Sequence, residues 1–145
     1  MNVAIFDQQL SLTVHGFSGT ALNKDYAGTA FKLMDKMWRI VKSNNLKNKG
    51  LNIWVYDDND SVFAGVELDD TPNPDLGLKQ NNIELLKYAS YKHIGPYQLI
   101  KQAGQQMTVD LKEKGYETRL PYIEIYGQWT NDETKLETDL LMCLK

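Results

Sequence analysis

The chain has 145 residues, a length that fits one domain with a sizeable core. Hydrophobic residues make up 42% of it and charged residues 24%, which is ordinary for a soluble globular protein. A formal net charge of -3, without any Lys/Arg run, argues against nucleic acid as a direct partner. A single cysteine excludes an intramolecular disulfide, and one cysteine with two histidines argues against a metal site.

The N-terminal residues carry neither a basic region nor a long apolar run, so the sequence has no recognisable signal peptide. No stretch approaches the ~18 apolar residues that a membrane span needs. We therefore expect a cytoplasmic protein that does not contact a membrane, and no pattern in the sequence calls for a cofactor.

The first half of the chain predicts a strand, a helix and a hairpin. Residues 10–15 alternate between apolar and polar side chains, as a half-buried strand does, and Gly16, Ser18 and Gly19 are expected to end it. Apolar residues recur at steps of three and four over 25–43, which predicts an amphipathic helix capped by Asn23 or Asp25. Residues 51–57 and 61–68 predict two strands around a polar turn at 57–60.

The second half predicts the same elements after a linker. Residues 69–82 contain two of the four prolines and separate the halves. Residues 83–94 predict one long strand, and Pro96 suits the first turn of a helix that ends at Gly115. Residues 122–126 and 138–144 predict the last two strands.

One strand–helix–strand–strand unit therefore occurs twice, over residues about 8–68 and 83–145, within a single domain. In the strand after each helix, Trp54 and Tyr56 correspond to Glu124 and Tyr126. The β-branched residues between them are expected to pack under the helices. The two half-sheets are then expected to face each other across a cleft lined by rings, hydroxyls and one carboxylate, a composition typical of small-molecule pockets.

Three segments together resemble the GyrI-like effector-binding family, the ligand domain of many AraC-type and MerR-type drug-responsive regulators. The first is His93-Ile94-Gly95-Pro96-Tyr97, the second is Pro121-Tyr122-Ile123-Glu124-Ile125-Tyr126, and the third spans residues 136–144. No single motif is specific, so the resemblance rests on their order and spacing. It implies an α+β fold, in which the duplicated unit forms a distorted antiparallel barrel or curved sheet with two flanking helices.

The resemblance also implies a pocket for lipophilic, often cationic, compounds, with Glu124 as its acid. Polar residues of alternating strands usually face solvent, but the repeat and the resemblance both favour the pocket. A carboxylate among rings is costly unless it is paired or protonated, and a cationic ligand can supply the missing partner. The full set of candidate ligand-binding residues is Glu124, Tyr126, Tyr91, His93, Trp54, Tyr56 and Trp38. Among these, Trp38 also fits a helix core, and His93 fits a structural hydrogen bond.

We favour a standalone binding protein for a lipophilic cationic molecule over an enzyme. The alternative is a small-molecule hydrolase that uses Glu124 with Tyr91 or Tyr126, since some standalone members of the resembling family are hydrolases. No nucleophile-elbow, Walker or HExxH sequence occurs. A gyrase-inhibitor-like protein interaction, or a homodimer, is a further alternative. No helix-turn-helix precedes the first strand, so regulation of a promoter by this chain alone is not expected.

Overall fold

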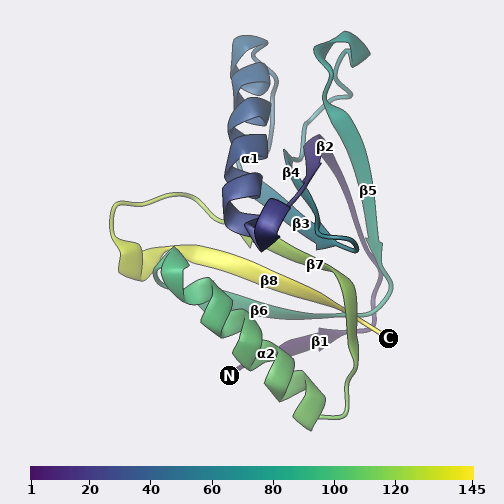
Figure 1. Cartoon of the computed structure of the whole chain (residues 1–145), viewed down its shortest axis with the longest axis vertical. Helices are drawn as coiled ribbons and strands as arrows, with labels where there is room; N and C mark the ends of the chain where they lie inside the picture. The colour runs from purple at the N-terminus through teal and green to yellow at the C-terminus, as the bar shows by residue number, and fades with distance from the viewer.

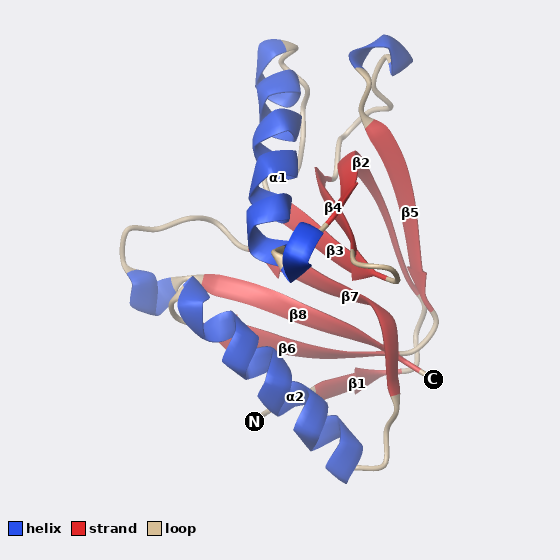
Figure 2. Cartoon of the chain, viewed as in Figure 1, coloured by secondary structure: helices blue, strands red, loops and turns tan.

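The computed structural model describes residues 1–145 as one antiparallel sheet with two α-helices (Figure 1). The eight strands lie in the order β1-β6-β8-β7-β3-β4-β2-β5. Both helices lie beside the curled sheet, as the colouring by secondary structure makes clear (Figure 2). The α+β class, the curved sheet and the two flanking helices that the sequence predicted are confirmed. The elements are β1 (Ala4–Phe6), β2 (Leu10–Thr20), α1 (Tyr26–Ser43), β3 (Asn52–Asp57), β4 (Ser61–Val66), β5 (Lys79–Leu85), β6 (Tyr88–Ile94), α2 (Ile100–Glu113), β7 (Thr118–Tyr126) and β8 (Glu137–Leu144).

The repeated unit is present as β2–α1–β3–β4 and as β6–α2–β7–β8. Its two copies join where β3 pairs with β7, with Trp54 opposite Glu124 and Val55 opposite Ile123. Each copy also lends an edge strand to the other, because β1 precedes β2 but pairs with β6, and β5 precedes β6 but pairs with β2. The exchange ties the halves into one sheet.

Strand β2 runs to Thr20, so the prediction that the glycines after residue 15 end it is wrong. Gly16 lies opposite Gly65 of β4, and a Cβ at residue 16 would overlap the carbonyl oxygen of Ala64. Glycine here permits two strand backbones to approach closely instead of breaking the strand.

The segment between the halves also differs from the prediction. Strand β5 begins at Lys79, inside the region expected to be a linker, and residues 83–94 form parts of two strands that are separated by Leu86 and Lys87. The linker proper is therefore shorter than residues 69–82. It contains the short 3-10 helix Pro74–Leu76, which is closed by Gly77 in the left-handed conformation.

The helices cover the opposite face of the sheet from the one we expected. Ile53, Val55 and Ile123 belong to a buried cluster that joins strands of both halves and contains no helix residue. Helix α1 packs instead on the face that carries Trp54, and α2 packs on the face that carries Leu140. The compact β-branched residues fill the inside of the curled sheet, which leaves the larger rings on the face that the helices share. Neither helix is both long and apolar enough to cross a membrane.

Candidate functional site

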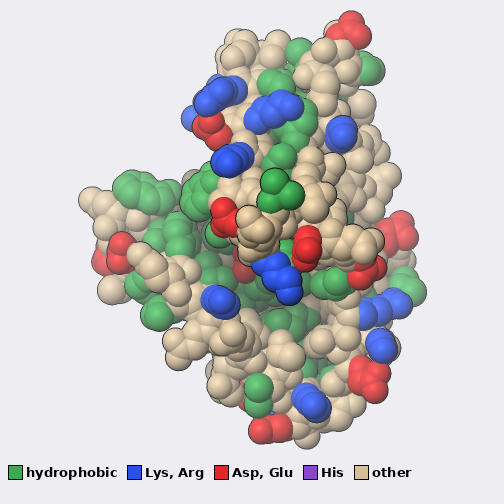
Figure 3. All heavy atoms as spheres, in the orientation of Figure 1, with side chains coloured by type: hydrophobic (Ala, Val, Ile, Leu, Met, Phe, Trp, Pro, Cys, Tyr) green, Lys and Arg blue, Asp and Glu red, His purple; other side chains and the backbone are tan.

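A cavity of about 1330 Å³ lies between α1 and α2, over the central strands β3 and β7. It is not the expected cleft between two facing half-sheets, because both helices and the aromatic residues share one face of a single sheet. Hydrophobic side chains gather in the hollow between the helices (Figure 3). The lining includes Phe31 and Met34 from α1, Trp54 and Tyr56 from β3, Ile100 and Gly104 from α2, and Tyr122, Glu124 and Tyr126 from β7.

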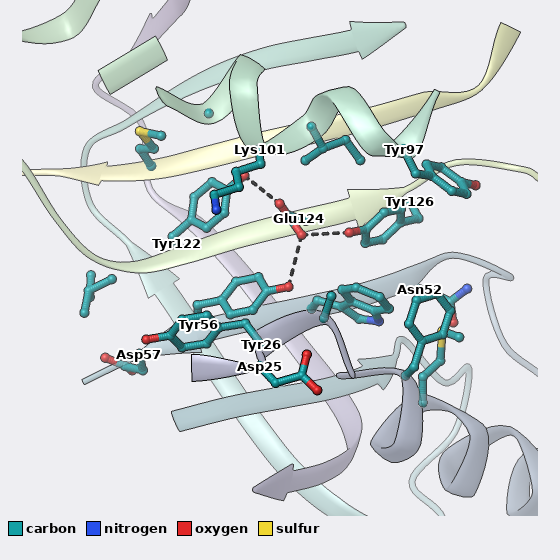
Figure 4. Close-up of a pocket in the computed structure, with 18 of the residues that line it drawn as sticks. Asp25, Tyr26, Asn52, Tyr56, Asp57, Tyr97, Lys101, Tyr122, Glu124 and Tyr126 are labelled. Atoms are coloured by element: carbon teal, nitrogen blue, oxygen red, sulfur yellow. Dashed lines mark hydrogen bonds between the residues drawn. The ribbon is translucent and has the colours of Figure 1, made fainter. Parts of the chain in front are cut away.

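Glu124 lies at the centre of this lining and is only 7% exposed. Tyr126 and Tyr56 donate hydrogen bonds to its Oε1 atom over 2.7 and 3.2 Å, and Tyr122 donates to Oε2 over 2.8 Å (Figure 4). No salt bridge includes this carboxylate. The three phenols converge on one acid because residues 122, 124 and 126 share a face of β7, and Tyr56 faces them from β3.

The three phenols are held in their protonated form. Burial, then the charge of Glu124 and the hydrogen bond to it, raise the pKa of Tyr56, Tyr122 and Tyr126 well above the usual value for tyrosine. Each hydroxyl therefore remains a donor at neutral pH, and a carboxylate is a pure acceptor. Hydrogen bonds to an ionised acceptor are the stronger kind, and here three donors converge on one carboxyl group.

Aromatic rings flank the acid in two connected rows. In the first row, Tyr126 lies between Trp54, at a centroid distance of 4.7 Å, and Tyr97, at 5.5 Å. In the second row, Tyr56 stacks on Tyr122 at 5.8 Å. The first two pairs are tilted and edge-on and the third is stacked, and all five residues line the cavity. A flat or multi-ring ligand therefore meets aromatic surface on both sides of the carboxylate.

Charged side chains gather at the mouth of the cavity. Asp57, Asp58 and Asp60 in the β3–β4 turn line it together with Asp25, which caps α1 by accepting a hydrogen bond from the backbone N–H of Gly28. The hydroxyl of Tyr26 donates to Asp60 and joins this turn to the start of α1. Two lysines, Lys24 and Lys101, also line the cavity.

Four of the seven candidate residues line the cavity: Glu124, Tyr126, Trp54 and Tyr56. Tyr91, His93 and Trp38 are outside it. Tyr91 pairs with Leu140 on β8 and packs against the α2 cluster, so the helix covers it. The Nε2 atom of His93 lies 3.1 Å from the carbonyl oxygen of Pro96 and supports the turn before α2. Trp38 packs against the core under α1 and donates to Asn52.

Some cavity residues were not among the candidates. Tyr122 has the same strand phase as Glu124 and Tyr126, so the alternation of β7 already contained the signal for it. Tyr97 belongs to the short 3-10 helix Tyr97–Leu99 before α2, Phe31 belongs to α1, and both are exposed. Strand periodicity carries no information about them, since their place depends on how the helices sit over the sheet.

No protein-family model and no curated protein matches the sequence. Solved structures nevertheless match the fold over nearly the whole chain. The C-terminal domain of EcmrR has a TM-score of 0.80 at 14% identity, over 99% of this chain and 97% of that one. SAV2435 bound to tetraphenylphosphonium has a TM-score of 0.65 at 20% identity, over 100% and 94%. A hydrolase from Listeria innocua has a TM-score of 0.59 at 12% identity, over 99% and 91%. The fold that the resemblance implied is confirmed.

Proposed function

We propose that this chain, which shares its fold with the C-terminal domain of EcmrR and with SAV2435, binds a lipophilic organic cation between α1 and α2. One observation carries the proposal. Glu124 is a buried carboxylate without a salt-bridge partner, and it lies in a large cavity that is lined by aromatic rings. The binding residues in this proposal are Glu124, Tyr126, Trp54 and Tyr56, to which we add Tyr122.

The physical argument begins with the cost of burying a charge. An ionised carboxylate without a counter-charge is destabilised in an apolar site, and hydrogen bonds from neutral phenols offset only part of that cost. A ligand cation about 5 Å away adds an attraction of roughly 3 kcal/mol at an effective dielectric constant near 20. Each ring face adds about 0.5–2 kcal/mol of cation–π attraction. Both contributions require positive charge, so they favour cations over neutral molecules of the same shape.

The size of the cavity supports a bulky ligand. Its volume of about 1330 Å³ is above the roughly 300–1,000 Å³ that is usual for small-molecule sites. Tetraphenylphosphonium, the compound bound to SAV2435, is a bulky monocation with four phenyl groups. It is therefore a reasonable first probe for this chain.

Two probes of nearly equal shape and opposite charge test the proposal. Tetraphenylphosphonium and tetraphenylborate are titrated separately into the wild type and Glu124→Gln by calorimetry. We expect the wild type to prefer the phosphonium, and Glu124→Gln to weaken its binding by at least about tenfold, since that factor corresponds to only ~1.4 kcal/mol.

The control variant is Glu113→Gln, which removes the same charge from an exposed position of α2 outside the cavity lining. It should bind the phosphonium as the wild type does. Equal phosphonium affinity in the wild type and Glu124→Gln would contradict the assigned role of Glu124.

A second candidate is hydrolysis of a small electrophile in the same cavity. The observation that favours it is the set of three phenol donors beside one carboxylate, which resembles an acid–base arrangement. Glu124 would accept a proton from the attacking water while a phenol donates a hydrogen bond to the substrate. Turnover of an ester and epoxide panel that disappears in Glu124→Gln would support this candidate, and rates equal to buffer for the whole panel would exclude it.

A further inference from the structure

Lys101 lies on the stripe of α2 that faces the cavity. Ile100 and Lys101 begin the helix, and Gly104, Gln105 and Thr108 follow at spacings of three, four and seven from Lys101; all five residues line the cavity. Residues at these spacings share one helix face. Lys101 therefore reaches the cavity because of its place in the helix, whereas Lys24 belongs to the aspartate-rich mouth.

Lys101 and Glu124 line the same cavity, and α2 approaches the hydrogen-bonded group around the acid. A Cβ at Gly104, one turn along the helix, would lie 3.6 Å from the hydroxyl of Tyr122, and that hydroxyl donates to Glu124 over 2.8 Å. In the close-up of the cavity, the Lys101 side chain runs from α2 past the ring of Tyr122 (Figure 4). Its ammonium forms no salt bridge with any carboxylate, so it is free to interact with a bound molecule.

We propose that Lys101 and Glu124 make the cavity dipolar, so that Lys101 selects aromatic cations that also carry an anionic group. This inference rests on the proposed function, since it takes the binding of the cationic end at Glu124 as given. A bare cation is attracted by Glu124 but is repelled by the Lys101 ammonium in the same cavity. A ligand with a carboxylate beside its cationic rings offsets that repulsion by pairing with Lys101. Lysine is suited to this role because its flexible stem carries a compact charge with three donors.

A pair of dyes isolates the effect of the second charge. Rhodamine 123 is a cationic methyl ester, and rhodamine 110 is the corresponding zwitterion with a free carboxylate. The dissociation constant of each dye is measured by fluorescence anisotropy with the full chain at neutral pH. Because the dyes share one ring system, the ratio of their affinities reports the exchange of the methyl ester for a carboxylate.

The wild type should bind rhodamine 110 more tightly than rhodamine 123, and Lys101→Met should reverse this preference. We expect tighter binding of rhodamine 123, weaker binding of rhodamine 110, and a change of about tenfold in their affinity ratio, as for one screened charge contact near a protein surface. Lys101→Arg keeps the charge and should keep the wild-type ratio. The matched control is Lys112→Met, three helical turns further along the same face of α2 and outside the cavity lining.

The possible failures are distinguishable. If the wild type binds both dyes and Lys101→Met leaves their ratio within twofold of the wild-type value, the role of Lys101 is wrong and the proposed function stands. If Lys112→Met changes the affinity ratio as much as Lys101→Met does, the role of Lys101 is also wrong, because the effect would then come from the net charge of the protein. If neither dye binds to any of these proteins, this inference is refuted, whereas the proposed function is decided separately by the phosphonium titration.

Discussion

At the scale of single residues, the hydrogen bonds to Glu124 are unevenly shared. Its Oε1 atom accepts from Tyr126 and from Tyr56, whereas Oε2 accepts only from Tyr122. Loss of a donor to Oε1 leaves a second donor in place, but loss of the donor to Oε2 leaves a buried, charged oxygen without one. An unsatisfied buried acceptor costs more than a hydrogen bond normally contributes.

Tyr122→Phe should therefore lower the free energy of unfolding by about 1.5–3 kcal/mol, the range for hydrogen bonds to charged groups. Tyr56→Phe should cost less, because its bond of 3.2 Å is the longest of the three and Tyr126 remains on the same oxygen. Urea denaturation of both variants measures the difference. A larger loss in Tyr56→Phe than in Tyr122→Phe would show that the carboxylate is held differently.

At the scale of elements, sequence periodicity identified most helices and strands but did not show how they pack on one another. Alternation in β3 and β7 placed Trp54 and Glu124 on one face, and spacings of three and four located α1 and α2. Alternation separates the two faces of a strand but does not say which face a helix will cover. The pattern therefore could not show which side of the sheet the helices cover. For the same reason it could not show that α2 covers Tyr91 and excludes it from the cavity.

Strand β2 shows a second limit of sequence-based prediction. A glycine in the sequence can either end a strand or permit two strand backbones to approach closely, and the sequence alone does not distinguish the two roles. The structure assigns the latter role to Gly16, where any side chain would overlap the Ala64 carbonyl, and leaves ordinary space at Gly19. The pairing of the exchanged strands β1 and β5 could not be predicted either, because their partners β6 and β2 are distant in sequence. Register between such strands depends on tertiary packing.

Substitution of the two glycines by alanine tests this assignment. Gly16→Ala should lower the free energy of unfolding by more than about 2 kcal/mol, because a rigid backbone carbonyl has to move. Gly19→Ala meets only the side chains of Leu33 and Thr29, at 3.6 Å or more, and should change stability by less than about 1 kcal/mol. Thermal unfolding of both variants measures the effect. Similar melting temperatures for the two would contradict the close approach of β2 and β4.

At the scale of the whole molecule, the acid couples the binding cavity to the stability of the fold. Three of the eight tyrosines share Glu124, and they come from strands of both halves. Their pKa values are raised in the folded state by burial and by the acid's charge. The unfolded chain therefore loses these protons first, so their stabilising effect is complete below about pH 10 and declines as the pH rises further.

Alkaline denaturation tests this coupling. The free energy of unfolding of the wild type should fall as the pH rises above about 10, because the unfolded state ionises first. In Glu124→Gln the fall should end at a lower pH, because one of the causes that raise the pKa of the three phenols in the folded state is removed. Tyrosinate absorbance and urea midpoints, recorded together, measure both effects. An identical pH dependence of stability in the two proteins would mean that the charge of Glu124 does not reach these phenols.

The most direct test of the central claim is to locate a bound cation by NMR. Intermolecular NOEs are recorded between the phenyl protons of tetraphenylphosphonium and the aromatic protons of the protein. The account predicts NOEs to the rings of Trp54, Tyr56 and Tyr126, which line the cavity around Glu124. NOEs confined to rings outside the cavity, such as the stacked pair Phe6 and Tyr88, would contradict it.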